Sequence, residues 1–482
     1  MSVNRRNFLL GTAAAAANAG VAAAMPAAAV AQQSAKPKKQ PNVVIYHSDQ
    51  FRWDFVGANG HNNSVRTPNL DALAERGTNF NHMVTNQPVC APSRSVLLTG
   101  RYATETGVWR NGLGLSQDMP TIATEFRKAG YSANYIGKWH LQANVPGDTS
   151  GRGYVKPEHR GGFDGVFDAS NALEASAHPY YGTIWDRDGN EITYKDQYRV
   201  DFITDRAEKF LRQKQEKPFL LVISQLEPHQ QNDMGQPIAP KGFAERYLNA
   251  TVPADLRALP GTWQAQLPDY YGCIESIDNS VGRVRKILAE ENMAEDTIFV
   301  FVSDHGCHFM TRNQEYKRST HNSSLRVPLL IDGPGFEHGR QISELVGMVD
   351  IAPTIMEAAG VAVPSGVKGR SFFPLLSSAE ARQSWPNQQF IQISESMTGR
   401  AIRTKQWTYC VADPTGITTE AASTNYHEYQ MYDQGADPYE LVNLAGRKEY
   451  KEIASTLRDQ LKKVMVQAGE ADPEIVPAKL YP

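Results

Sequence analysis

The feature that most constrains the fold is a pair of β-branched apolar runs, each of which stops at an aspartate. Residues 42–48 precede Asp49, and residues 296–303 precede Asp304. Continuous apolar runs of this length are typical of strands buried on both faces, as in parallel sheets. Because parallel strands end at the same edge of a sheet, we expect the two aspartates to lie together at that edge.

Segments with helical periodicity lie between these runs, at residues 69–76, 121–129, 200–213 and 270–290, and further apolar runs occur at 132–136 and 219–224. Strands that alternate with helices predict an α/β fold, with a large and mostly parallel central sheet covered by helices on both faces. Residues 143–195 show weak periodicity and are rich in Gly, Asp, His and aromatic residues. We expect them to form a surface loop that faces the substrate.

Length favours two domains, because 482 residues exceed the roughly 250–300 that a single core accommodates. Toward the C-terminus the pattern changes to short alternating runs at 390–393 and 406–410, followed by a helical segment at 450–467. We therefore expect a larger N-terminal catalytic domain over residues 41–372. A smaller α+β domain with an antiparallel sheet is expected over residues 373–482.

Residues 1–31 have the composition of an export signal. Arg5 and Arg6 precede Phe-Leu-Leu, an Ala-rich and weakly apolar stretch follows, and Ala-Val-Ala at 29–31 offers a small-residue cleavage site. The pattern resembles a twin-arginine signal, which directs proteins exported in the folded state. An uncleaved membrane anchor is the alternative, disfavoured by the alanine-heavy composition. We expect residues 32–40 to be a linker and the protein to be periplasmic or secreted, exported by the twin-arginine machinery.

Charge and cysteine content exclude two classes of partner and site. Lys and Arg number 49 against 52 for Asp and Glu, without a long basic run, so we expect no binding of nucleic acid. The four cysteines are too few and too scattered for a disulfide framework or a thiolate zinc site. They are Cys90, Cys273, Cys307 and Cys410.

The most specific motif begins at Cys90. Residues 90–101 read Cys-Ala-Pro-Ser-Arg-Ser-Val-Leu-Leu-Thr-Gly-Arg. This segment matches the signature of the sulfatase family in full, so the chain resembles the formylglycine-dependent, type I sulfatases of the alkaline phosphatase superfamily. The resemblance extends over about residues 41–444 and implies an alkaline phosphatase-like fold and hydrolysis of sulfate monoesters. A free cysteine at a helix N-terminus is the alternative interpretation of Cys90 taken alone.

In that family a formylglycine-generating enzyme reads the Pro and Arg of the motif on the unfolded chain and oxidises the cysteine to formylglycine. The hydrate of this residue carries two hydroxyls on one carbon. One hydroxyl attacks sulfur to form a covalent sulfo-enzyme, and deprotonation of the other restores the aldehyde and expels sulfate. The resemblance implies that Cys90 supplies this nucleophile and that its modification precedes export.

The resemblance also implies a divalent-cation site. Asp49-Gln50 and Asp304-His305 fall where the family has its metal ligands, and the hydroxyl derived from Cys90 completes the set. Carboxylate and amide oxygens suit Ca²⁺, which we expect here. Gln50 and His305 depart from the commonest family pattern, as they do in choline-sulfatase-like enzymes and phosphonate monoester hydrolases, and they leave Mn²⁺ and Zn²⁺ as alternatives.

Five cationic or imidazole side chains match further family positions. By resemblance, Lys138 contacts sulfate, His140 hydrogen-bonds the formylglycine hydrate, and Arg94 holds the hydrate and offsets the carboxylates. His229 and Lys317 flank the leaving oxygen, so both are candidates for the general acid and for substrate binding. Donors of this kind stabilise the charge that spreads over the sulfuryl oxygens in the transition state.

The substrate is less constrained than the reaction. His321 stands where many relatives carry tyrosine, and we expect it to bind substrate. Other polar or aromatic residues near site residues in the sequence are Arg52, Trp53, Trp109, Arg110, His308 and Arg312. Export, long loops and tryptophans favour a sulfated carbohydrate derived from a polysaccharide. An arylsulfatase, a choline-sulfatase-like enzyme, a phosphonate monoester or phosphodiester hydrolase, and an inactive relative that only binds sulfated glycans are the alternatives.

Overall fold

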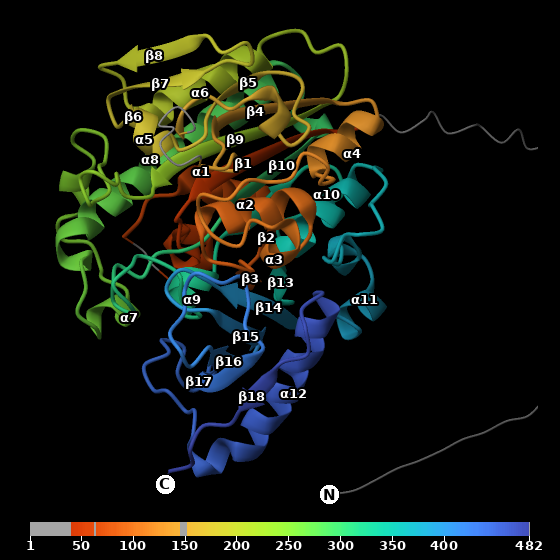
Figure 1. Cartoon of the computed structure of the whole chain (residues 1–482). Helices are drawn as coiled ribbons and strands as arrows, with labels where there is room; N and C mark the ends of the chain where they lie inside the picture. The colour runs from red at the N-terminus through yellow and green to blue at the C-terminus, as the bar shows by residue number, and fades with distance from the viewer. Residues whose placement is uncertain (1–39, 62–63, 145–151, 482) are drawn as a thin grey trace, which may run out of the picture. The chain divides into compact units, whose positions relative to one another are not determined.

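The computed structural model describes residues 40–61, 64–144 and 152–481, and Gln40–Pro482 form one compact unit (Figure 1). The predicted signal peptide and nearly all of the predicted linker lie outside the described residues. Within the described ranges, no helix combines the length and apolar character that crossing a bilayer requires. The domain boundary after residue 372 stays a prediction.

An eleven-stranded sheet runs through the larger part of this unit (Figure 1). Its order is β12-β2-β11-β10-β1-β9-β4-β5-β7-β6, and β8 pairs with β7. The five central strands, β10 to β5 in this order, are parallel, and antiparallel pairs flank them. The bounds are β1 Asn42–Asp49, β2 Thr78–Phe80, β4 Ser132–Lys138, β5 Phe167–Ser170, β6 Ala177–His178, β7 Tyr181–Trp185, β8 Glu191–Lys195, β9 Phe219–Pro228, β10 Thr297–Ser303, β11 Leu329–Asp332 and β12 Arg340–Ile342. The predicted α/β class is confirmed.

Helices cover both faces of this sheet (Figure 1). Alternate residues of β1 face opposite sides, so Val43 and Ile45 join one hydrophobic core while Val44 and Tyr46 join the other. The first core includes residues of α2 (Cys90–Thr99), α4 (Ile122–Lys128) and α10 (Ile351–Ala358), and the second includes residues of α1 (Pro68–Arg76), α6 (Arg199–Leu211) and α8 (Trp263–Glu290). The strand is therefore buried on both faces, as its continuous apolar run predicts.

The predicted helices are present with small shifts of their ends, except that α8 begins at Trp263 rather than near residue 270. Pro268 lies inside its second turn, where a proline obscures the sequence signal of a helix start. The surface loop predicted for residues 143–195 was wrong over residues 167–195. It contains β5 to β8 and the short helix α5 (Leu173–Ser176), which extend the main sheet. Strands of two to five residues are too short to show periodicity.

A second sheet, with its own hydrophobic core, follows in the chain. It contains β14 (Gln388–Ile393), β15 (Gly399–Thr404), β16 (Trp407–Ala412), β17 (Asn425–Asp433) and β18 (Glu474–Val476). The predicted antiparallel sheet is confirmed for β14 to β17, whereas β17 and β18 pair in parallel. Leu457, Leu461 and Met465 of α12 (Lys451–Gln467) recur every four residues and pack into this core.

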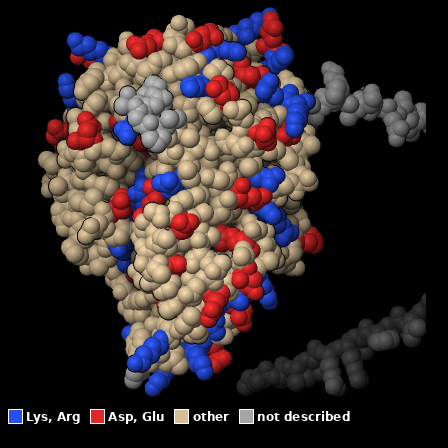
Figure 2. Space-filling model, in the orientation of Figure 1, with Lys and Arg blue, Asp and Glu red and all other residues tan. Residues whose placement is uncertain are grey.

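The remaining elements are short. They are β3 (Met83–Val84), β13 (Val346–Gly347), α3 (Ala103–Thr106), α7 (Ala254–Arg257), α9 (Asn322–Leu325) and α11 (Ala379–Gln383). On the face shown in Figure 2, acidic and basic side chains are interspersed.

Candidate active site

Four neighbouring parallel strands deliver polar side chains to one edge of the main sheet. Asp49 ends β1, Lys138 ends β4, His229 follows β9, and Asp304 follows β10. All four side chains are almost completely buried. The expectation that the two aspartates meet at one sheet edge is confirmed, because their ligand atoms lie within 4.8 Å of each other.

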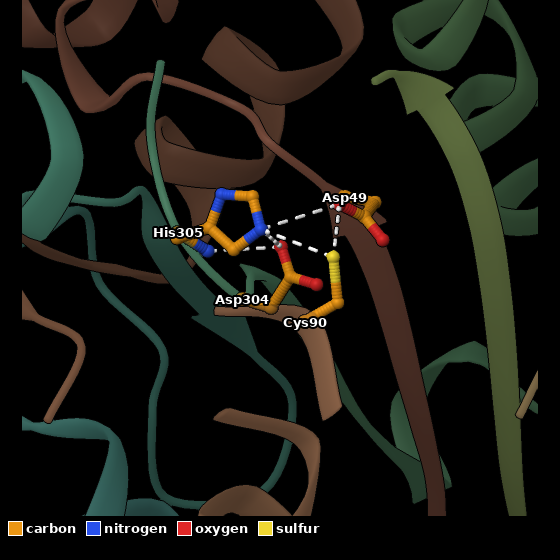
Figure 3. A group of neighbouring side chains, drawn as sticks. All are labelled: Asp49, Cys90, Asp304 and His305. Atoms are coloured by element: carbon orange, nitrogen blue, oxygen red, sulfur yellow. Dashed lines mark hydrogen bonds and ion pairs between the residues drawn. The ribbon is translucent and has the colours of Figure 1, made fainter. Parts of the chain in front are cut away.

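Cys90 enters the same place from a helix. It is the first residue of α2, every residue of which is buried. Its Sγ lies 3.6 Å from Asp49 Oδ1 and 3.4 Å from His305 Nε2 (Figure 3). The backbone N–H of Ala91 donates to Asn111 Oδ1 over 3.0 Å, which satisfies one of the free donors at this helix end. The side chain at position 90 is thus fixed at the centre of the group.

Asp49, Cys90, Asp304 and His305 converge on one point (Figure 3). His305 Nδ1 lies 2.9 Å from the carbonyl oxygen of Gly306 and donates to it, so Nε2 is the ring nitrogen that faces the other three residues. Nε2 is 3.5 Å from one carboxylate oxygen of each aspartate. Three facing electron-rich groups are repulsive unless a cation lies between them, so the donor set fits a metal ion.

Gln50 strengthens this interpretation. Its backbone is held in the left-handed region at φ 68°, and its N–H donates to Asp304 Oδ1 over 3.0 Å. The amide Nε2 donates to Gln230 Oε1 over 2.9 Å, which leaves Oε1 buried without a hydrogen-bond partner. Asp304 Oδ2 also accepts no hydrogen bond. Buried oxygens that accept no hydrogen bond from the described residues are suited to a divalent cation.

Two buried cationic side chains offset the carboxylates. Arg94 Nη2 lies 3.0 Å from Asp49 Oδ2 and 3.5 Å from Asp304 Oδ2. Lys138 Nζ lies 2.8 Å from Asp49 Oδ2 and 3.2 Å from Glu174 Oε2. Burial opposes the charge of Lys138, but the neighbouring carboxylates outweigh it and hold the pKa of this amine above its ordinary value. Both cations therefore stay protonated at neutral pH.

Lys317 and His229 lie on the other side of Cys90. Lys317 Nζ is 3.0 Å from Cys90 Sγ and 3.0 Å from His229 Nε2. His229 Nδ1 lies 2.6 Å from the carbonyl oxygen of Gln230 and donates to it, so Nε2 accepts from the lysine. Burial and the charge of Lys317 lower the pKa of His229. The pair therefore consists of a neutral imidazole and a lysine that donates.

Burial alone would raise the pKa of the Cys90 thiol, but Lys138, Lys317 and His305 outweigh burial and lower it well below its ordinary value. His140 contributes through a hydrogen bond to the same sulfur. The half-buried His140 has a left-handed backbone at φ 61°. The position is therefore highly electropositive, which suits an anionic oxygen as well as a thiolate.

The structure places His321 away from this group. Its Nε2 lies 3.2 Å from the hydroxyl of Tyr432 on β17, and no contact with the residues around Cys90 is present within the described part of the chain. The predicted role of His321 in substrate binding stays a prediction.

Of the other polar or aromatic residues singled out, His308 supports the site directly. Its Nε2 donates to the backbone carbonyl of Lys317 over 3.0 Å. Arg52 pairs with Asp54 and Asp255, and the guanidinium of Arg110 lies 5.2 Å from the ring centre of Trp109. The ion pairs of Arg52 therefore hold the fold together, whereas residues 109–111 lie next to α2, the helix that begins at Cys90.

The family model for sulfatases matches residues 41–361, which is more than half of the chain. The chain belongs to the sulfatase family. A second model, described as the C-terminal region of N-sulphoglucosamine sulphohydrolase, matches residues 314–467. The predicted family is therefore confirmed over the main sheet and most of the second sheet.

Named sulfatases and solved structures of the same fold cover nearly the whole chain. An ulvan-active sulfatase of Formosa agariphila is 31% identical over 91% of this chain and 83% of its own length. A Bacteroides thetaiotaomicron structure, titled for metabolism of multiple glycosaminoglycans, superposes with a TM-score of 0.79 at 22% identity, over 90% of this chain and 97% of that one. A phosphonate monoester hydrolase of Agrobacterium radiobacter gives a TM-score of 0.65 at 22% identity, over 89% and 96%. The last two likenesses show the fold.

Sequence reasoning missed the residues that support this sulfatase site. Glu174, which pairs with Lys138, lies in the segment expected to be a loop, and no motif marks it. Glu395, in the turn after β14, accepts from the backbone N–H of Asn111 over 3.2 Å and pairs with Arg318 at 3.1 Å. These contacts join distant segments, and only the adjacency of Arg318 to Lys317 in the sequence could have signalled one of them.

Proposed function

We propose that this member of the sulfatase family hydrolyses sulfate monoesters of carbohydrates, with a formylglycine made from Cys90 as the nucleophile. The observation that carries the proposal is the set of three side chains around Cys90 Sγ. Lys317 lies at 3.0 Å, His140 hydrogen-bonds the same sulfur, and Lys138 adds positive charge from the end of β4. A sulfate ester needs such donors, because negative charge spreads over the sulfuryl oxygens during transfer.

In the proposed reaction, one hydroxyl of the hydrated aldehyde at position 90 attacks the sulfur atom while the bond from sulfur to the sugar oxygen breaks. Lys317 is placed to give its proton to the departing oxygen, and His229 accepts from Lys317 and orients it. His140, which hydrogen-bonds position 90, is placed to take the proton of the second hydroxyl. The bond from carbon to the sulfated oxygen then breaks, sulfate leaves, the aldehyde re-forms, and water hydrates it again.

Asp49, Gln50, Asp304 and His305, with the oxygen at position 90, would hold the divalent cation. When bound, the cation polarises a sulfuryl oxygen and favours ionisation of the attacking hydroxyl. We propose Ca²⁺, because four of these five donors are oxygens. Arg94 keeps the two carboxylates from repelling each other and also donates to the backbone carbonyl of Lys138 over 2.8 Å.

Three observations support a carbohydrate as the substrate. The ulvan-active relative, 31% identical, acts on a polysaccharide, and the C-terminal family model carries the name of a sulphohydrolase of an amino sugar. Locally, the guanidinium of Arg110 lies over the ring of Trp109, next to Asn111, whose side chain accepts a hydrogen bond from the first turn of α2. An aromatic ring with hydrogen-bonding neighbours suits a sugar ring.

The test is a panel of defined sulfated oligosaccharides, 4-nitrophenyl sulfate, and a phosphonate monoester, assayed with the purified protein after co-expression with a formylglycine-generating enzyme. We expect release of inorganic sulfate from at least one saccharide, with higher kcat/KM than for the aryl ester. A phosphonate preference would favour the phosphonate hydrolase alternative, for which Gln50 and His305 are the sequence basis. Saccharide binding without turnover would favour the inactive relative.

We also propose that residues 1–31 direct export by the twin-arginine route. The support is the Arg5-Arg6 pair ahead of a weakly apolar, alanine-rich stretch. Changing both arginines to lysine is expected to leave active protein in the cytoplasm of the native host, as measured by fractionation and sulfatase assay. Normal secretion of the double variant would contradict this route.

A further inference from the structure

A second charged cavity lies outside the catalytic group. It has a volume of about 520 Å³, and its walls come from the segment after β1, the start of α9, the turn between β15 and β16, and residues 434–440. Its lining includes Arg326, Arg403 and Lys405 but none of the residues that surround Cys90. A volume of this size accommodates one sugar unit or a similar small molecule. We call it the arginine pocket.

The cations that line the pocket differ in how closely they pair with carboxylates, and Arg312 and Lys405 form no ion pair within the described residues. Arg52 pairs with Asp54 at 2.7 Å and with Asp255 at 3.0 Å. By contrast, Arg326 forms no ion pair with a carboxylate of the described chain, and Arg403 reaches Glu440 only at 3.5 Å. The pocket therefore contains uncompensated positive charge, which costs free energy when it is partly shielded from water.

The guanidinium groups also carry unused donors. Arg326 Nη2 donates to the carbonyl of Asn81 over 2.5 Å and Arg403 Nη1 donates to Thr408 Oγ1 over 2.7 Å. Nε of both arginines is buried without a hydrogen-bond partner in the described chain. Within the described residues, Arg326 Nη1 and Arg403 Nη2 also make no hydrogen bond. Both residues line the cavity, so these free donors are available to a ligand bound there.

The pKa values in the pocket reflect its positive charge. Burial and the charge of Arg403 lower the pKa of Arg326 to about 9, and burial lowers the pKa of Arg403 to about 10. Burial and the same two arginines lower the pKa of His82 to about 4, so this imidazole adds no charge at neutral pH. Arg326 is stacked 3.3 Å above the ring centre of Trp53, which fixes the direction of its free edge.

We propose that the arginine pocket is a second anion-binding site, in which Arg326 and Arg403 hold a sulfate or carboxylate group carried by a saccharide unit that is not being hydrolysed. Planar guanidinium groups match such oxyanions through paired N–H donors. The inference that a saccharide carries the group rests on the proposed function. The inference that the group is anionic rests on the pocket itself. Exposed Tyr439, with polar Asn322 and Gln434, completes walls of the kind that bind sugars.

Calorimetric titration of a Cys90→Ala protein tests this proposal, because that protein binds without turnover. The probes are a sulfated tetrasaccharide prepared from ulvan and, separately, inorganic sulfate. We expect Arg326→Gln and Arg403→Gln to weaken tetrasaccharide binding by at least about tenfold each, and Arg326→Lys to weaken it less. Arg257→Gln is the matched control, since Arg257 is exposed beside the pocket without lining it.

Unchanged tetrasaccharide affinity in both glutamine variants, or an equal loss in Arg257→Gln, would overturn the proposal. Loss of inorganic sulfate binding but not of tetrasaccharide binding would also overturn it, because the pocket would then bind a free anion. Turnover of 4-nitrophenyl sulfate by the same variants with Cys90 intact separates this inference from the proposed function. We expect that turnover to be unchanged, and its failure in the unsubstituted protein would count against the sulfatase proposal alone.

Discussion

The group around Cys90 and the arginine pocket both contain buried arginines, but they balance charge in opposite ways. Arg94 lies within 3.5 Å of two carboxylates, and both carboxylates also face Nε2 of His305. Arg326 stacks on the ring of Trp53 and donates to one backbone carbonyl, but it has no carboxylate partner within the described chain. The first region has more electron-rich groups than its protein cations satisfy, whereas the second has unused donors. The comparison indicates a resident cation in one region and an incoming anion in the other.

The largest expected difference is in chemistry, because only the first region holds a nucleophile. Replacing Cys90 with alanine is expected to lower kcat on sulfate esters by at least about 10³-fold, since no other group can form the sulfo-enzyme. Initial rates on 4-nitrophenyl sulfate measure this. Cys273→Ala is the control, because Cys273 is buried on α8, where its Sγ lies 3.6 Å from the hydroxyl of Tyr198. Comparable losses in both variants would mean that the effect is structural.

Removal of the cation is expected to have the next largest effect and to be confined to the first region. Dialysis against a chelator should reduce sulfatase activity by about 100-fold, because several kcal/mol of transition-state stabilisation are lost. It should also lower the melting temperature, since Asp49 and Asp304 then repel each other. Readdition of Ca²⁺ should restore both quantities. Arg326→Gln should respond like the unsubstituted protein, and a chelator-resistant activity would contradict the cation site.

A third contrast is how much Arg94 and Arg326 contribute to the stability of the folded protein. Arg94→Met is expected to reduce the free energy of unfolding by about 3 kcal/mol, because it leaves two buried carboxylates without their shared partner. Arg326→Met is expected to change it by about 1 kcal/mol or less, since the loss of one hydrogen bond is offset by relief of repulsion from Arg403. Chemical denaturation with Ca²⁺ present measures both. Equal effects would remove the distinction between the regions.

Glu174 gives the smallest of these effects on activity. Glu174→Gln is expected to lower kcat/KM by about tenfold, because Lys138 keeps Asp49 but loses its second carboxylate and its fixed position. Burial favours the neutral carboxyl, but Lys138 outweighs burial and lowers the pKa of Glu174 to about 2, so the lost group is a full negative charge.

The matched control for Glu174 is Glu470→Gln, which removes a buried partner of Arg400 in the second sheet. An equal loss of kcat/KM in the control would assign the effect to general destabilisation. Restoration by Glu174→Asp, even in part, would support a charge-positioning role.

The sequence was sufficient to predict that the residues around Cys90 converge, because most of them follow strands. Asp49, Lys138, His229 and Asp304 each end or follow a strand whose apolar run or neighbouring motif is visible, and parallel pairing then brings them together. The Cys90 motif identified the residue that faces this edge, whereas α2, which begins at that residue, was not predicted. The same reasoning predicted the two-sided burial of the sheet.

The rest could not be predicted because it depends on contacts between distant segments. Glu174 reaches Lys138 only after β5 joins the main sheet, and residues 143–195 show too little periodicity to place that strand. Arg326 and Arg403 are 77 residues apart, and nothing in either segment signals the other. His321 was assigned from its neighbours in the sequence, whereas its side chain turns to Tyr432 on the second sheet.

The most direct test of the central claim is mass spectrometry of the peptide that contains Cys90, from protein purified from its native host, combined with a sulfatase assay of the same sample. We expect active protein to carry formylglycine at position 90, and we expect sulfatase activity to rise with the modified fraction. Hydrolysis of sulfate esters by protein in which position 90 is entirely an unmodified thiol would contradict it.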